Sequence, residues 1–141
     1  MSLRREVFGA EATLTGVELY DIRALIRIYF AERPRREVVM APELQAMDPG
    51  LSEHERRMET ARIASTFSHR LITDAGLRDD VGTVYEPAGG HGGGGTHSYH
   101  VGFVFAPAIP SEAARVVFTY GGVDFAFDWP GRRLPKATRP R

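Results

Sequence analysis

The amino-acid sequence predicts an all-β fold, an antiparallel β-sandwich of seven to eight strands with one short inserted helix at about residues 52–64. Three observations indicate this fold. Several segments alternate apolar and polar residues, as strands with one buried face do. Two adjacent glycines separate two such segments near the C-terminus. The 15 glycines and 9 prolines among 141 residues favour turns, and the length suits one domain, expected over residues 1–130.

The first two strands are expected in residues 10–20 and 23–32. In the first segment the apolar side chains change face after Gly16, and such a shift at a glycine predicts a bulge or a strand break. The second segment alternates without interruption, so we expect one buried face and one outward face. The side chains expected on the buried face are Ala24, Ile26, Ile28 and Phe30, and those expected outward are Leu25, Arg27 and Tyr29.

Three further strands follow from shorter patterns. A brief strand is expected at residues 37–40, after an exposed turn. Phe67 and Leu71 have the same parity in "FSHRLIT", which predicts a strand there as well. The strand with the most regular alternation of the three carries Tyr99, Val101, Phe103 and Phe105.

The clearest element is a hairpin in the segment "RVVFTYGGVDFAFDW". A two-residue loop at Gly121-Gly122 is a common connection between antiparallel strands. The register that it implies places six apolar side chains on one face, because cross-strand partners share a face. The expected pairs are Tyr120 with Val123, Phe118 with Phe125, and Val116 with Phe127.

One segment departs from the β pattern and predicts the helix. Ser52 is a suitable N-cap, and Glu55 three residues later completes a capping box. Glu53 and Arg57 are four residues apart, in the order that favours an ion pair on a helix. The apolar stripe is thin, so we expect a surface helix that lies over an open end or edge of the sandwich.

The second half of the chain resembles a known class of domain. "ITDAGLRDDVGTVYEP" contains an Asp-Asp-x-Gly-Thr-x-Tyr core at residues 79–85, and "VGFVFAPAIPSEAARVVFTY" contains a proline corner before the last strands. Residues 66–130 resemble immunoglobulin-like or fibronectin-type-III-like sandwiches of bacterial proteins. The resemblance implies an immunoglobulin-like fold and no particular function. Asp79 and Asp80 are expected to cap the turn through nearby backbone N–H groups.

Composition narrows the classes of partner. Lys+Arg and Asp+Glu balance at 18 each, so the chain has no net field that would attract nucleic acid or a membrane surface, and neither is expected as a partner. Cysteine is absent, which excludes disulfides and thiolate ligands. Without an apolar run or a signal-like N-terminus, a cytoplasmic location is expected. Residues 131–141 carry five basic residues and no acid, and are expected to be a disordered tail.

A glycine-histidine segment at residues 88–100 is the main candidate site. His91, His97 and His100 lie within ten residues, and histidine is a common metal ligand. Against a metal site, residues three apart on a strand point to opposite faces, and no Asp or Glu lies between Glu86 and Glu112. A flexible connection between strands is the simpler interpretation of the segment.

The chain shows no catalytic motif, and we expect neither an enzyme nor a cofactor. The sequence therefore favours a non-catalytic β-sandwich module for interaction or regulation, with a protein partner or a second copy of the chain. The surfaces expected to interact are His91 and His97 in the glycine-rich segment, and an outward apolar patch at Leu25 and Tyr29. The alternative is a small metal- or ligand-binding protein that uses residues 88–100.

Overall fold

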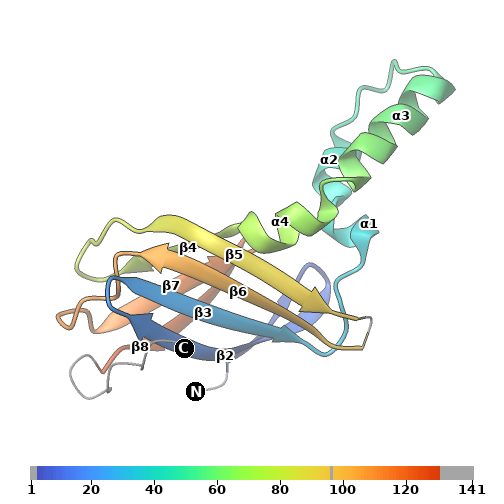
Figure 1. Cartoon of the computed structure of the whole chain (residues 1–141). Coiled ribbons are helices and arrows are strands. Elements are labelled where there is room, and N and C mark those ends of the chain that lie inside the picture. The colour runs from blue at the N-terminus through green and yellow to red at the C-terminus, as the bar shows by residue number, and fades with distance from the viewer. Residues whose placement is uncertain (1–2, 96, 131–141) are drawn as a thin grey trace.

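The computed structural model describes residues 3–95 and 97–130 and shows two antiparallel sheets that pack face to face as a β-sandwich (Figure 1). One sheet has five strands in the order β1-β2-β3-β6-β5, and the other has three in the order β4-β7-β8. The strands are β1 (Leu3–Val7), β2 (Ala10–Tyr20), β3 (Arg23–Phe30), β4 (Ala75–Asp79), β5 (Glu86–Gly94), β6 (Tyr99–Ala106), β7 (Arg115–Tyr120) and β8 (Val123–Asp128). The helices are α1 (Arg36–Val39), α2 (Ala41–Gln45), α3 (Glu53–Ala64) and α4 (Phe67–Thr73).

The register expected from local pattern is confirmed in two places. In the β7–β8 hairpin, Tyr120 pairs with Val123, Phe118 with Phe125 and Val116 with Phe127. In the β2–β3 pair the register shifts between Leu14 and Gly16, which is the expected irregularity at the glycine. Both features depend on residues close together in sequence, where turn chemistry and side-chain parity determine pairing.

The core lies between the two sheets and is rich in aromatic side chains. Phe118 of β7 is fully buried and its ring centroid lies 5.3 Å from that of Phe103 on β6. Tyr120 is also fully buried, 4.9 Å from Phe103. The alternating side chains expected to face inward from β3 and β6 are all buried. Trp129, at the end of β8, belongs to the same cluster.

Two predicted strands are helices instead, so the chain has more helix than the single insertion we expected. Residues 36–39 form α1 and residues 67–73 form α4. Phe67 and Leu71 are both buried, but they share the inner face of a helix. A spacing of four residues places side chains on one face of a strand and also on one face of a helix, so this spacing does not distinguish the two.

The glycine-rich segment is also not the expected loop, because residues 86–94 form β5, an edge strand paired with β6. On the inner face of β5, neighbouring groups approach the glycine backbone so closely that a side chain would not fit. A Cβ atom at Gly90 would lie 2.7 Å from the carbonyl oxygen of Ile72 in α4, and one at Gly92 would lie 2.5 Å from the hydroxyl oxygen of Tyr99. Glycine thus allows α4 and Tyr99 to pack against this strand.

We expect Gly90→Ala to lower the free energy of unfolding by about 1–3 kcal/mol, because the added methyl group meets backbone atoms of α4. Gly93→Ala is the matched control on the same strand, since no atom lies within 4 Å of its added Cβ. Its effect should stay within about 0.5 kcal/mol. Urea denaturation of both variants measures the difference, and equal effects would show that α4 does not pack against β5 as described.

Helix α4 links the sandwich to the helices before it. The Tyr120 hydroxyl donates a hydrogen bond of 2.6 Å to the backbone carbonyl of Leu71, in the buried interior. Arg70 of α4 forms an ion pair with Glu43 of α2. Burial raises the pKa of the Tyr120 hydroxyl far above its ordinary value, and the charges of Tyr99 and Asp74 add to this effect. The hydroxyl therefore stays protonated and can donate this hydrogen bond.

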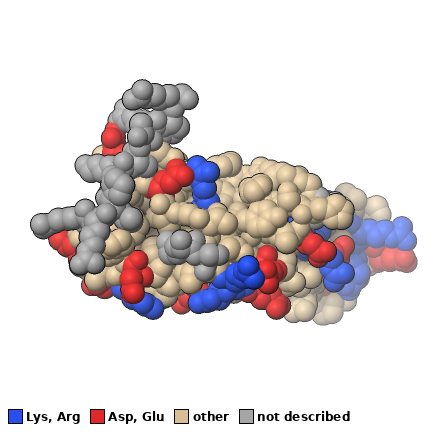
Figure 2. Space-filling view, turned by 90° about the horizontal axis from the view of Figure 1, so that it is seen from below, with Lys and Arg blue, Asp and Glu red and all other residues tan. Residues whose placement is uncertain are grey.

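Charged side chains of both signs are interspersed on the face of the molecule seen in Figure 2. This distribution agrees with the balance of charges in the sequence. Within residues 3–95 and 97–130, no helix is long and apolar enough to cross a membrane. The tail expected to be disordered, residues 131–141, lies outside the described residues.

Candidate functional site

The helices α1, α2 and α3 form an arm, residues 36–64, which we call the helical arm. Figure 1 shows α3 extending away from both sheets, and its packing partner is α2. The expectation that this helix lies over the sandwich is therefore wrong. Among the 12 residues of α3 only Ile63 is buried. Tertiary packing against the described residues thus contributes little to the stability of α3.

Local interactions define where α3 begins. The Ser52 hydroxyl accepts a hydrogen bond from the backbone N–H of Glu55, and the Glu55 carboxylate accepts one from the backbone N–H of Ser52. The predicted capping box is therefore confirmed, as is the ion pair between Arg57 and Glu53 at 2.7 Å. A capping box stabilises a helix by about 1 kcal/mol, and an exposed ion pair by a few tenths of a kcal/mol. These contributions are small, so an isolated helix of this length is only marginally stable in water.

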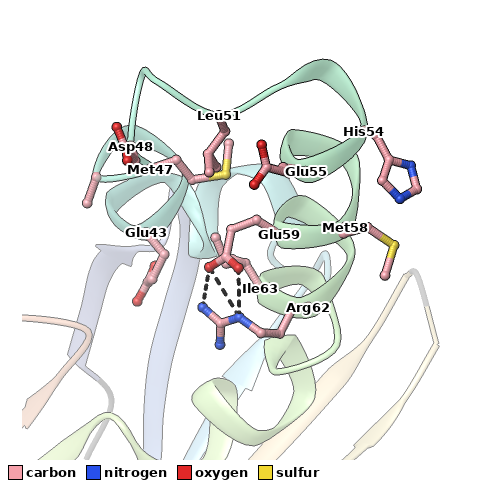
Figure 3. A pocket seen from close by; sticks show the side chains of 11 residues that line it. Glu43, Met47, Asp48, Leu51, His54, Glu55, Met58, Glu59, Arg62 and Ile63 are labelled. Carbon is pink, nitrogen blue, oxygen red and sulfur yellow. Dashed lines mark hydrogen bonds and ion pairs between the residues drawn. The ribbon is translucent and has the colours of Figure 1, made fainter.

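A hollow of about 830 Å³ lies between α2 and α3, and we call it the arm hollow (Figure 3). Met47 and Leu51 project into the space between the two helices, whereas Met58 and His54 point away from α2. Met58, which also lines the hollow, is 62% exposed. The complete lining is Glu43, Ala46, Met47, Asp48, Leu51, His54, Glu55, Met58, Glu59, Arg62 and Ile63.

The arm hollow carries more negative than positive charge. Four carboxylates line it. Glu43 is paired with Arg70 and Glu59 with Arg62. The excess negative charge therefore comes from Asp48 and Glu55. The backbone hydrogen bond from Ser52 lowers the pKa of Glu55, and a side-chain hydrogen bond from Arg62 lowers the pKa of Glu59. Both groups therefore keep their negative charge in mildly acidic conditions. The hollow combines an apolar floor with an acidic rim.

Sequence reasoning missed the arm hollow, although one indication was present. Three of the four methionines of the chain, Met40, Met47 and Met58, fall within this part of the sequence. Methionine adapts its shape to different partners and is common on protein-binding surfaces. The hollow itself depends on how α2 and α3 are oriented, which local patterns do not reveal.

The structure brings two of the three candidate metal ligands to one face. His91 lies on β5 opposite Gly102, and His100 lies on β6 opposite Gly93, so both project from the outer face of the five-stranded sheet. His97 is exposed between the two strands and does not join them. Within residues 3–95 and 97–130, no group of three His, Cys, Asp or Glu side chains could hold a metal ion.

The expected apolar patch on the outer face is smaller than predicted. Leu25 is only 9% exposed, so the prediction that it forms part of an exposed apolar patch is wrong. Tyr29 is half-buried, and its ring lies 5.1 Å from the imidazole of His100, centroid to centroid. Tyr29 therefore belongs with the histidines and offers an aromatic surface to a ligand.

The two aspartates at the end of β4 have different backbone partners. Asp79 accepts hydrogen bonds from the backbone N–H groups of Val81 and Thr83 and from the Tyr85 hydroxyl. Asp80 accepts from the backbone N–H groups of Ala114 and Arg115. The turn-capping role expected for Asp79 is confirmed. The role expected for Asp80 is wrong, because its carboxylate binds distant backbone groups just before and at the start of β7.

No family model matches the chain, and neither does any curated protein or solved structure. The resemblance of residues 66–130 to immunoglobulin-like domains therefore stays a prediction, and conclusions about function depend on the residues themselves.

Proposed function

We propose that this protein is a non-catalytic interaction module in which the arm hollow binds an apolar segment of a protein partner that is flanked by Lys or Arg residues. The observation that carries the proposal is that α3 buries a single residue, Ile63, while Met58 remains exposed beside a hollow with an apolar floor. A partner that covers this surface supplies the packing that the chain itself lacks.

The expected gain on binding is substantial for so small a surface. Fully burying a methionine or leucine side chain contributes about 1.5–3 kcal/mol each. Met47, Leu51 and Met58 are accessible to a partner, being half-buried or exposed. A helix that lies in a groove between two others is a recurring mode of recognition, with a few apolar side chains as anchors.

The acidic rim determines the charge of the partner. Asp48 and Glu55, whose charges no arginine pair compensates among the described residues, attract Lys and Arg side chains that flank the apolar anchors. Charge pairs at an exposed rim are screened by salt, so binding should weaken as ionic strength rises. An acidic partner segment would be repelled.

Other expectations from the sequence remain proposals with different support. An immunoglobulin-like topology is supported by the two antiparallel sheets and by the aspartate-capped turn at residues 79–85. A homodimer is supported by β5, an exposed edge strand that pairs only with β6 among the strands that the structure describes. The cytoplasmic location is supported by the sequence alone.

A selection from a phage-displayed library of random peptides tests the proposal. We expect the selected peptides to combine apolar residues with Lys or Arg. The variant Leu51→Lys should bind them at least about tenfold more weakly, because a cation replaces an apolar contact in the hollow. Fluorescence anisotropy with labelled peptides measures this change.

The matched control is Ile22→Lys, which places the same charge on an apolar residue that is 68% exposed in the β2–β3 turn. This variant should bind the peptides as the parent protein does. Peptides that bind both variants equally, or that are predominantly acidic, would contradict docking in the arm hollow.

A further inference from the structure

A second hollow lies on the outer face of the five-stranded sheet and shares no lining residue with the arm hollow. Its volume is about 450 Å³, within the range of small-molecule sites. Its lining is Thr15, Arg27, Ile28, Tyr29, His91, His100, Val101 and Gly102. We call it the histidine hollow. It contains His91, His100 and Tyr29, which the sequence singled out separately.

Strand register explains why the surface is hollow. One row across the sheet runs from Arg27 on β3 through Gly102 on β6 to His91 on β5. Neighbouring strands lie about 4.8 Å apart, so Arg27 and His91 are separated by one strand that has no side chain between them. The imidazole of His91 lies over Gly102, where an added Cβ would collide with it. Gly102 thus forms the floor.

The next row carries an aromatic pair. Tyr29 and His100 are cross-strand partners, and their rings are tilted by 47°. This row lies two residues along the strands from the first, which corresponds to about 7 Å. The two rows therefore offer polar donors at one end of the hollow and aromatic rings at the other.

The hollow is lined by side chains that can donate hydrogen bonds to a ligand, among them Arg27, His91 and His100. Arg27 forms an ion pair of 3.1 Å with Glu18 through Nη2. Glu18 raises the pKa of the Tyr20 hydroxyl, and the same guanidinium acts on this hydroxyl with a smaller, lowering effect. A guanidinium has five N–H donors, so Arg27 can donate to a ligand while it holds Glu18. The imidazoles of His91 and His100 have no hydrogen-bond partner among residues 3–95 and 97–130. No carboxylate is part of the lining, and the Glu18 carboxylate beside it is paired with Arg27.

We propose that the histidine hollow binds a small aromatic carboxylate. The carboxylate accepts hydrogen bonds from Arg27 and from the His91 imidazole above Gly102, because a guanidinium group and a ring N–H are good donors to an anionic oxygen. The ring of the ligand stacks beside Tyr29 and His100. This site is independent of the protein-binding role proposed for the helical arm.

A titration with benzoate, followed by ¹H–¹⁵N NMR of the whole chain, tests the proposal. We expect saturable shifts at the amides of Gly102, His91 and His100. Benzamide has the same ring and no charge, and it should bind at least about tenfold more weakly. Cyclohexanecarboxylate keeps the charge without the aromatic ring and should also bind more weakly. Equal affinities for benzoate and benzamide, or shifts confined to other surfaces, would overturn the proposal.

Two variants locate the site. Gly102→Ala should weaken benzoate binding at least about tenfold, because the new methyl group takes the space below the His91 imidazole. Gly76→Ala on β4 is the matched control, since no atom lies within 4 Å of its added Cβ. Arg27→Gln removes an exposed charge at little risk to the fold and should weaken binding similarly. Unchanged affinity in Arg27→Gln would overturn the proposed contact whatever the behaviour of Gly102→Ala.

Discussion

Replacing Phe118 by alanine is expected to lower the free energy of unfolding by about 3–5 kcal/mol, the range measured for buried aromatic residues. Phe118 is fully buried, and its ring lies against the rings of Phe103 on the facing sheet and Phe125 on the neighbouring strand. Removing it leaves a cavity where the two sheets meet, and the side chains around it can close this space only in part.

Urea denaturation of the parent chain and of Phe118→Ala measures this loss. Tyr29→Ala is a suitable comparison, because it removes an aromatic ring from the outer face of the opposite sheet, where Tyr29 is half-buried. Its cost should be only about 1 kcal/mol. If the two variants were equally destabilised, the core would not lie between the sheets as described.

Asp79→Ala is expected to lower the free energy of unfolding by about 2–3 kcal/mol near neutral pH. One carboxylate accepts three hydrogen bonds, from Val81, Thr83 and Tyr85, and hydrogen bonds to charged groups contribute about 1.5–3 kcal/mol each before exposure to solvent reduces them. The variant leaves all three donors without this acceptor. Tyr85→Phe removes one of the three and should cost about 1 kcal/mol.

The contribution of Asp79 should depend on pH in a defined direction. Burial raises the pKa of Asp79, but the hydrogen bonds from Thr83, Tyr85 and Val81 outweigh this effect and leave it below its ordinary value. A carboxylate with a lowered pKa stabilises the folded state above the unfolded-state pKa of about 4. That stabilisation is lost as pH falls through the lower, folded-state value.

The difference in unfolding free energy between the parent chain and Asp79→Ala should therefore be largest near pH 7 and should shrink in acid, below about pH 4. Denaturation midpoints over this range measure it. A difference that grows as pH falls would mean that the hydrogen bonds to the ionised carboxylate are not what holds residues 79–85.

Elements whose geometry is determined by nearby residues could be predicted from sequence. The Gly121-Gly122 hairpin, the capping box at Ser52 and the turn at Asp79 all involve partners within a few residues of one another or directly across a tight turn. Their register or hydrogen bonding follows from spacing alone, and the structure has each of them as predicted.

Elements that depend on distant partners were predicted less well. Strand β5 contains five glycines, a residue type that disfavours strands. It forms because β6 pairs with it and α4 covers its inner face. Leu25 has the parity of an outward residue, yet it is only 9% exposed. Parity gives the face on which a side chain lies but not what covers that face.

The candidate sites have the same limitation. His91 and His100 lie near Arg27 because three strands bring them into adjacent rows, and Arg27 is more than sixty residues away in sequence. The arm hollow likewise needs the orientation of α3 relative to α2. In both cases the residue types were visible in the sequence, whereas their proximity required the fold.

Native-state hydrogen exchange of the free protein most directly tests whether the helical arm lacks the packing that a partner would supply. Because α3 buries only Ile63, its amides should exchange at least about a hundredfold faster than those of β6 and β7, and a bound peptide from the selection should slow them. Amides of α3 that exchange as slowly as those of the sheets in the free protein would show that the arm is already stabilised, and would contradict its role as a docking element.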